Sequence, residues 1–177
     1  MTDSKKYNGS TWQHSLRKLD YTSWQDAYVK EKSENVISFA AAQTIVNNGV
    51  TFVSDGMGQY TVNGTVTADA SADFDIPEFT IPVSIGAGGK GTLSLFNDSF
   101  GDNDGNTIEF YNNTTLIDVW SLHLDNRTST TYVGMGGKKC NRIRIVVPSG
   151  VGVDHKTVNP MFTNNSTLPP AYEPYWK

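Results

Sequence analysis

The residues of this chain best suited to chemistry are aromatic and planar polar side chains that could hold a sugar. A saccharide offers an apolar C–H face and many hydroxyl groups, so its capture needs flat rings together with amide, guanidinium or carboxylate groups. Both kinds occur between positions 111 and 132, where the candidates are Tyr111, Trp120, Asn126, Arg127 and Tyr132, with Asp118 and Asp125 as nearby acceptors. This stretch indicates a glycan-binding surface.

Trp120 has two interpretations. Residues of one parity lie on one face of a strand, which groups Leu116, Asp118, Trp120 and Leu122 against Ile117, Val119 and Ser121. The pattern favours a core position for Trp120 and leaves a ligand platform as the alternative. Tyr132 and Arg127 flank a Thr/Ser-rich turn, which makes them better surface candidates.

An acidic stretch over residues 97–106 raises the question of calcium, because hard cations bind several oxygen atoms held close together. Asp102 and Asp104 are the candidate ligands. The spacing does not fit a helix-flanked twelve-residue loop, and Asp104-Gly105 is also a tight-turn signal. A plain loop is therefore favoured over a calcium site, and no other cofactor is indicated.

Residues that could catalyse a reaction do not form a convincing set. Asp73 and Asp75 share one face of an expected strand and could in principle flank a glycosidic bond, but Pro77 marks this strand as a solvated edge. The three histidines, His14, His123 and His155, show no metal or general-base spacing. Cys140 is the single cysteine, which excludes an intrachain disulfide and indicates a structural thiol. We expect no enzymatic activity.

The composition of the chain argues against two classes of partner, nucleic acids and membranes. Charged residues make up 18% of the 177 residues and the net charge is -4, whereas nucleic-acid binding relies on clustered Lys and Arg. No run approaches the roughly 18 apolar residues of a membrane span, and residues 1–6 lead into polar sequence without an apolar signal core. We expect neither nucleic-acid binding nor membrane insertion, and synthesis in a cytoplasm.

The remainder of the chain is typical of an all-β protein. Short apolar runs alternate with Asn, Asp, Gly and Ser turns, as in a sandwich or barrel. Expected strands cover residues 36–40, 44–53, 59–68, 74–85, 91–97, 107–111, 115–124, 129–134, 141–147 and 156–163, with a turn at 55–58. Tyr60, Val62 and Val66 share one parity around Gly64, which predicts a half-buried strand with a glycine at a bulge or close contact. Residues 39–43 could instead form a short helical turn.

The first thirty residues contain a repeat with a period of twelve, in which Trp-Gln recurs in register. Each unit reads as a turn followed by a short strand, and two such units are too small to bury a core alone. We expect an attachment segment over residues 1–32, in which the anchoring side chains are Tyr7, Trp12, Tyr21 and Trp24. The main domain would then cover residues 33–177.

Two stretches resemble structural proteins of bacteriophages that infect Gram-positive bacteria. Residues 47–68, NNGVTFVSDGMGQYTVNGTVTA, are similar to a hairpin of the form NGVTF, turn, GxYTVNGTATA. Residues 142–150, 157–162 and 172–175, RIRIVVPSG, TVNPMF and YEPY, resemble the closing strands, in which KPM is followed by TYEPY. The N-terminal repeat is similar to KxYNGSxW elements beside such modules. The resemblance spans residues 34–177.

The resemblance implies a jelly-roll β-sandwich of carbohydrate-binding type, displayed on the virion with a short N-terminal β-repeat attachment segment. Implied partners are other virion proteins of the capsid, tail or baseplate, and host cell-surface glycans; by analogy with phage fibres the chain would be a homo-oligomer, such as a trimer. One alternative is a dedicated glycan-specific receptor-binding lectin. Another is an accessory carbohydrate-binding module of a secreted hydrolase.

Overall fold

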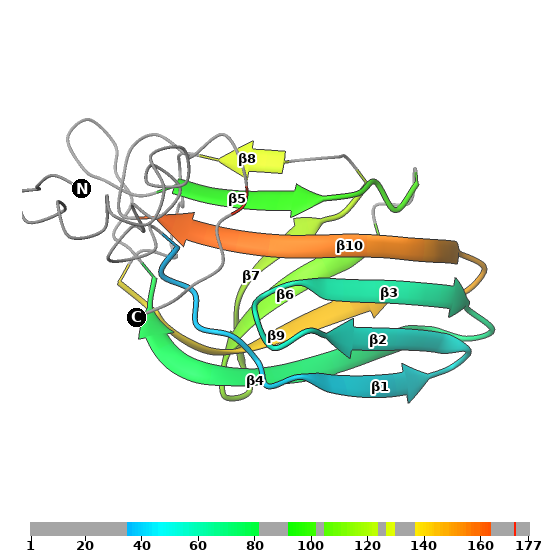
Figure 1. Cartoon of the computed structure of the whole chain (residues 1–177), viewed down its shortest axis with the longest axis horizontal. Coiled ribbons are helices and arrows are strands. Elements are labelled where there is room, and N and C mark those ends of the chain that lie inside the picture. The colour runs from blue at the N-terminus through cyan, green and yellow to red at the C-terminus, as the bar shows by residue number, and fades with distance from the viewer. Residues whose placement is uncertain are drawn as a thin grey trace, which may run out of the picture. The chain divides into compact units, whose positions relative to one another are not determined.

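Two antiparallel β-sheets pack face to face in this protein, forming a β-sandwich (Figure 1). The computed structural model describes residues 35–81, 92–101, 105–123, 127–129, 137–163 and 172, all within one unit, Ser33–Trp176. The described residues contain no helix, and so none that could cross a membrane. The expected all-β sandwich is confirmed. The attachment segment 1–32, with Tyr7, Trp12, Tyr21 and Trp24, lies outside the described residues.

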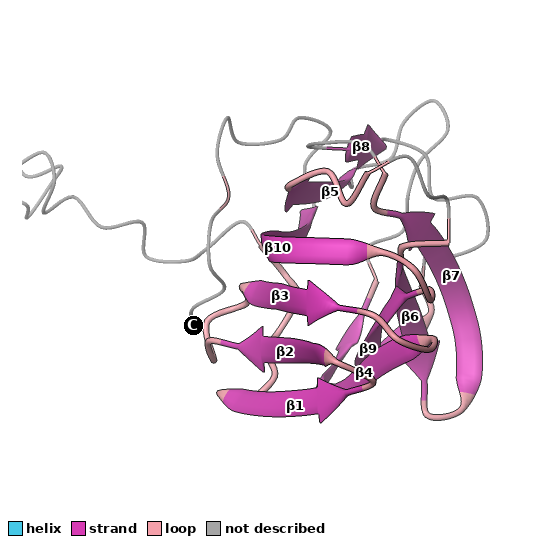
Figure 2. Cartoon of the chain, turned by 90° about the vertical axis from the view of Figure 1, so that its right-hand side faces the viewer, coloured by secondary structure: helices cyan, strands magenta, loops and turns pink. Residues whose placement is uncertain are grey.

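The six-stranded sheet has the order β1-β2-β3-β10-β5-β8. Its strands are β1 (Gln43–Asn47), β2 (Val50–Ser54), β3 (Tyr60–Thr65), β10 (Gly152–Thr163), β5 (Thr92–Asn97) and β8 (Arg127–Ser129). The four-stranded sheet has the order β4-β9-β6-β7, formed by β4 (Ala70–Thr80), β9 (Lys139–Val147), β6 (Thr107–Asn112) and β7 (Thr115–Ser121). Figure 2 shows the neighbouring strands β1, β2, β3 and β10 in front of β4, β6 and β9 of the second sheet.

Strict alternation of apolar and polar residues creates the core between the sheets. Along β4, Ala70, Ala72, Phe74 and Ile76 are buried while the intervening residues face outward, because successive side chains point to opposite faces of a strand. Aromatic rings join the two sheets: the Phe162 ring on β10 lies 5.4 Å from Phe110 on β6, and Tyr60 on β3 lies 4.8 Å from Phe74.

The predicted strand 44–53 is in fact two strands, β1 and β2, joined by the turn Asn48-Gly49. Both turn residues have positive φ, 46° and 86°, and this is the backbone that Asn-Gly favours in a two-residue hairpin. The predicted strand wrongly included Asn48-Gly49, although this dipeptide is itself a turn signal. The predicted turn at 55–58 is confirmed between β2 and β3, where the Asp55 carboxylate accepts hydrogen bonds from two backbone N–H groups.

β3 confirms the expected half-buried strand. Tyr60, Val62 and Val66 are buried, and Gly64 has φ of 140° where the backbone of β2 approaches closely. A side chain at Gly64 would overlap the carbonyl oxygen of Gly49 and approach the Val50 Cα at 3.1 Å. The glycine is therefore required by close backbone contact.

β4 is an edge strand of the four-stranded sheet, as its proline indicated. The pairing of β4 with β9 shifts register between Asp75 and Phe79, so Pro77 lies in a bulge where its missing N–H breaks no ladder. The strand covers Ala70–Thr80 rather than the predicted 74–85. Residues 82–91 lie outside the described residues.

Two other expectations were wrong in detail. Residues 36–40 form no strand: Asn35 makes one isolated bridge to Thr163, and the Val36 N–H donates to the Phe162 carbonyl. The helical turn at 39–43 is absent because Gln43 already belongs to β1. Of the expected strand at 129–134 only Ser129 is described, and it belongs to β8, Arg127–Ser129; residues 130–136 lie outside the described residues.

β10 carries a proline inside a central strand. β3 pairs with β10 only as far as Val158, so at Pro160 the ladder neighbour is β5. A residue without an N–H is tolerated at this position because the pairing of β10 with β3 has already ended.

Tyr172 contacts the six-stranded sheet from the far C-terminal part of the chain. Its hydroxyl donates to the Met57 carbonyl over 3.2 Å, and its ring meets Phe96 edge-on at 6.2 Å between centroids. Burial raises the pKa of Tyr172 above its usual range. This tyrosine, part of the YEPY motif, therefore packs against the sandwich.

Cys140 is fully buried on β9, and burial raises its pKa to about 11. Its Sγ donates weakly to the Arg142 carbonyl at 3.6 Å. Because the thiolate is the reactive form, this environment supports the expectation of a structural thiol.

Candidate functional site

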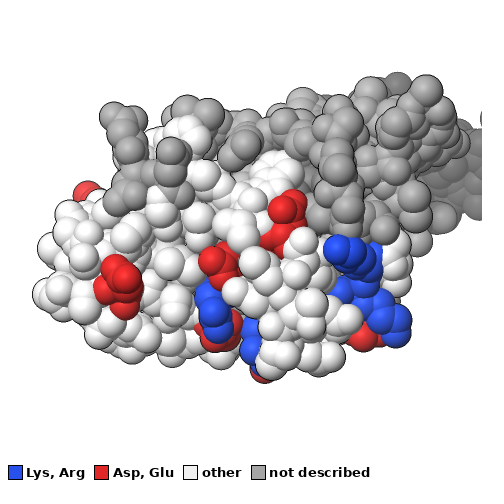
Figure 3. Space-filling model, turned by 180° about the vertical axis from the view of Figure 1, so that it is seen from behind, with Lys and Arg blue, Asp and Glu red and all other residues white. Residues whose placement is uncertain are grey.

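The outer face of the four-stranded sheet brings together side chains from three strands. Polar residues alternate with buried ones on β4, β9 and β6, so register places them in cross-strand rows. The rows comprise Asp73, Arg144 and Glu109, and next to them Asp75, Arg142 and Tyr111. Acidic and basic side chains lie beside one another in the view from behind (Figure 3).

Two ion pairs join β4 to β9 across this face. The Arg144 guanidinium binds the Asp73 carboxylate through two hydrogen bonds of 2.8 and 3.0 Å, and Arg142 binds Asp75 at 2.9 Å. The hydrogen bond to Asp73 raises the pKa of Arg144. Asp73 and Asp75 share a face, as expected, but each is paired with a different arginine. The arrangement orients the guanidinium groups and offers no free pair of acids for glycoside hydrolysis.

Tyr111 is fixed on this face by contacts on its ring and its hydroxyl. The Arg144 guanidinium carbon lies 5.1 Å from the ring centroid, a cation–π contact. The hydroxyl donates to Glu109 Oε2 over 2.6 Å. Burial, followed by this hydrogen bond, raises the pKa of Tyr111. The ring is half-buried and oriented before any ligand arrives.

Leu116 and Val119 on β7 extend Tyr111 into an apolar strip. Leu116 pairs with Tyr111 and Val119 with Glu109, so both share the outer face. They are 48% and 41% exposed, which is unusual for large apolar side chains in the described part of the chain. We name Tyr111, Leu116 and Val119 the apolar strip. The polar residues Glu109, Arg142 and Arg144 lie beside the apolar strip on the same face.

The predicted face of Leu116 was wrong. Parity grouped it with Trp120, but the β6–β7 register shifts between Phe110 and Tyr111, so one residue of β7, Ile117, is left without a partner. A bulge of this kind reverses the parity of everything beyond it. Leu116 therefore faces solvent while Trp120 faces inward.

Trp120 lies on the core side, only 8% exposed and opposite the buried Ile108. Its Nε1 donates to Asp118 Oδ2 over 3.0 Å, which satisfies the ring donor near the sandwich edge. In this structure it is the core residue that the pattern favoured, and its ring is not open to a ligand.

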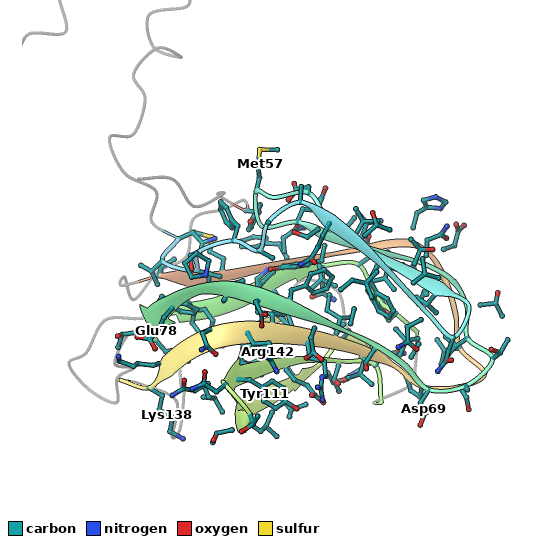
Figure 4. The ribbon with its side chains drawn as sticks, turned by 90° about the horizontal axis from the view of Figure 1, so that it is seen from below. Met57, Asp69, Glu78, Tyr111, Lys138 and Arg142 are labelled. Atoms are coloured by element: carbon teal, nitrogen blue, oxygen red, sulfur yellow. The ribbon has the colours of Figure 1, made fainter. Side chains whose placement is uncertain are left out.

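A surface hollow of about 290 Å³ adjoins the apolar strip at the β6–β7 turn. Its lining combines amide, hydroxyl, apolar and ammonium groups, from Asn112, Thr115, Leu116, Ile117, Lys138 and Lys139. Lys139 forms an ion pair with Glu78 at 2.7 Å. Figure 4 shows Tyr111 and Lys138 on the same side of the sandwich, opposite Met57.

The remaining predicted glycan residues lie in the other sheet or outside the described residues. Arg127 begins β8 in the six-stranded sheet, where its backbone pairs with Leu95, and its side chain is not described. Asn126, Tyr132 and Asp125 lie outside the described residues, as do the calcium candidates Asp102 and Asp104. Asp98, in the same loop, accepts hydrogen bonds from the Thr157 N–H and hydroxyl.

The described residues contain no group of three or more His, Cys, Asp or Glu that could hold a metal ion. His123 contacts the Ser121 hydroxyl at 2.7 Å, and His155 contacts Asp154 at 2.7 Å on an exposed bulge. The outer face of the four-stranded sheet presents exposed apolar side chains with hydrogen-bonded arginine and carboxylate groups beside them.

The sequence matches no family model, and comparison with curated proteins and with solved structures gives no match either.

Proposed function

We propose that the chain is a non-enzymatic structural protein of a bacteriophage particle, anchored through residues 1–32, whose sandwich faces outward for glycan adhesion or decoration. The proposal rests on the two motif resemblances in the sequence together with the architecture of the outer face. Other virion proteins would be the partners at the N-terminal end and host-surface glycans at the other. Assembly into a homo-oligomer such as a trimer would suit short N-terminal repeats that cannot bury a core alone.

The observation that carries the glycan part is the apolar strip within its polar frame. Leu116 and Val119 are exposed beside the half-buried Tyr111 ring, and the guanidinium groups of Arg142 and Arg144 are held in place by Asp75 and Asp73. A sugar needs this combination of a flat apolar contact and planar hydrogen-bonding groups. Groups already oriented in the free protein lose little entropy on binding.

We also propose that the sandwich has jelly-roll connectivity. Among the eight strands from β3 to β10, the first pairs with the last, and pairing continues inward as β4 with β9, β5 with β8 and β6 with β7. This is the pairing of one long hairpin folded into two four-stranded sheets, and it supports the assignment. β1 and β2 are then an N-terminal hairpin added to one sheet.

Replacing Tyr111 with alanine should weaken binding of host-surface polysaccharide about tenfold, because the oriented ring and its contact area are lost together. Titration calorimetry with the purified polysaccharide, after a glycan array has identified a ligand, measures the change. Tyr111→Phe is the matched control: it keeps the ring and the Arg144 contact, removes only the hydrogen bond to Glu109, and should stay within about threefold of the native protein.

A Tyr111→Ala protein that binds as tightly as the native chain would exclude the apolar strip as the site. Tyr132→Ala then tests the second location, predicted from sequence alone. If the array gives no ligand at all, the sandwich acts as a spacer or decoration. If affinity for one glycan is high and selective, the receptor-binding lectin is the better description.

Replacing both Trp12 and Trp24 with alanine should release the protein from particles, because aromatic anchors in pockets carry much of an interface's binding energy. Quantitative immunoblotting of purified virions measures occupancy. The control changes the preceding residue of each repeat, Thr11→Ala with Ser23→Ala, and should leave occupancy unchanged. Full occupancy by the double Trp variant would refute N-terminal anchoring.

A further inference from the structure

β1 is an edge strand whose own residues carry none of the usual protection against pairing. It lies at the end of the six-stranded sheet, and its five residues, QTIVN, contain no charge and no proline. Its pairing with β2 runs without a register shift. Sheet edges left in this state present a row of unpaired N–H and C=O groups to any further strand.

The neighbouring edge of the sandwich differs. β4 lies beside β1 (Figure 1), and it carries a bulge, Pro77 and the outward carboxylates of Asp73 and Asp75. Prolines, bulges and charges are the devices by which proteins block edge pairing. Among the described residues, one of two adjacent edges is therefore blocked, and the other, β1, carries none of these devices.

We propose that β1 pairs with β1 of a second copy of this chain, antiparallel and about a two-fold axis at Ile45. Asn47 and Val50 flank the two-residue turn of the β1–β2 hairpin, so they form a hydrogen-bonded pair. Hydrogen-bonded pairs alternate with non-hydrogen-bonded pairs along an antiparallel ladder, so Ile45 and Phe52 form the next hydrogen-bonded pair. The N–H and C=O groups of Thr44 and Val46 thus point away from β2. With the axis at Ile45, Thr44 of each copy exchanges two hydrogen bonds with Val46 of the other.

A second copy is the occupant that the composition of β1 favours. In a two-fold contact the residue on the axis faces itself and its neighbours lie close to their own copies, so a charge near the axis would lie close to a like charge. β1 has none. Val46 is 71% exposed, the highest fraction among the exposed large apolar side chains of the described residues, and pairing would cover it. Pairing through β1 would not depend on glycan binding.

One short strand buries far less area than a standard interface, so the dissociation constant of the isolated contact should be on the order of 0.1 mM. Many copies on one particle would strengthen such a contact through high local concentration. The pairing would join two six-stranded sheets into one continuous sheet.

Cysteine cross-linking of the full chain tests this register. Across the proposed axis Ile45 faces itself as a pair without hydrogen bonds, with Cα atoms about 4.5 Å apart, which is within disulfide range. Under mild oxidation, Ile45→Cys should therefore give at least about fivefold more covalent dimer than Thr44→Cys or Val46→Cys, because residues 44 and 46 each face the other position. The native chain, whose Cys140 is buried, gives the background.

Equal cross-linking of the three variants, or none above background, would overturn the proposal. Sedimentation of the native chain and of Val46→Lys provides a second measurement that does not depend on an introduced thiol. The lysine places like charges next to the axis, so it should raise the dimer dissociation constant at least about tenfold. If the β1 pairing is wrong, Val46→Lys will sediment as the native chain does, whatever oligomer the N-terminal repeats form.

Discussion

Replacing Phe162 with alanine lowers the free energy of unfolding by about 3–5 kcal/mol, the range for removal of a buried phenylalanine ring. Phe162 is fully buried on β10, and its ring lies 5.4 Å from Phe110 and 5.7 Å from Phe79. Since these two partners belong to the opposite sheet, the substitution leaves a cavity where the sheets are joined. Urea unfolding followed by fluorescence measures the loss.

Phe162→Leu is the control for this experiment. It keeps most of the volume and removes the edge-to-face geometry, so we expect it to cost less than about 1.5 kcal/mol. A loss below about 1 kcal/mol for Phe162→Ala would mean that the two sheets are not held together at this point.

Replacing Gly64 with alanine should cost roughly 2–5 kcal/mol, from backbone strain and overpacking together. The φ of 140° is one that residues with a side chain rarely adopt, and the added methyl group would meet the backbone of Gly49 and Val50. A backbone obstacle cannot move aside as a flexible side chain can. Thermal unfolding of the variant gives the change.

Gly152→Ala is a close control because Gly152 pairs with Thr65, the residue after Gly64. A Cβ built at Gly152 meets nothing within 4 Å. Its substitution should be neutral or should stabilise by up to about 1 kcal/mol, through reduced entropy of the unfolded chain. Equal effects at the two positions would show that glycine is needed in this region for some reason other than close backbone approach.

Much of the fold could be predicted from sequence because strand periodicity is local. The expected strands at 91–97, 107–111, 141–147 and 156–163 overlap β5, β6, β9 and β10. Parity also placed Tyr60 and Val62 in the core. The turn Asn48-Gly49 has a clear sequence signal, but apolar residues on both sides of it made residues 44–53 resemble one strand.

Other features of the fold could not be predicted from neighbouring residues in the sequence. The bulge at Ile117 depends on how β7 pairs with β6, and parity within β7 alone misplaced Leu116. Residues 36–40 have strand-like composition, yet only the preceding residue, Asn35, forms a bridge with the end of β10, and residues 36–40 form no strand. Such outcomes depend on neighbours distant in sequence.

The candidate site was predicted only in part. Tyr111 was named, but its partners Arg144 and Glu109 were not, because the contact of Arg144 with the ring and with Asp73 requires register across three strands. The alternation of Arg142 and Arg144 with buried isoleucines was a usable signal for the outer face. Leu116 and Val119 gave no such signal, since exposed apolar residues look like core residues in a sequence.

The pairing of early strands with late ones has a consequence for synthesis. The side-chain oxygen of Asn35 accepts from the Phe162 N–H, 127 positions away, and β3, which pairs with β2 on one side, finds its other neighbour only in β10. Neither contact can form until the ribosome has released nearly the whole sandwich, and folds dominated by such distant contacts are slow, taking milliseconds to seconds. The nascent chain must therefore wait with its apolar strands uncovered, a state that invites aggregation and makes chaperone assistance valuable.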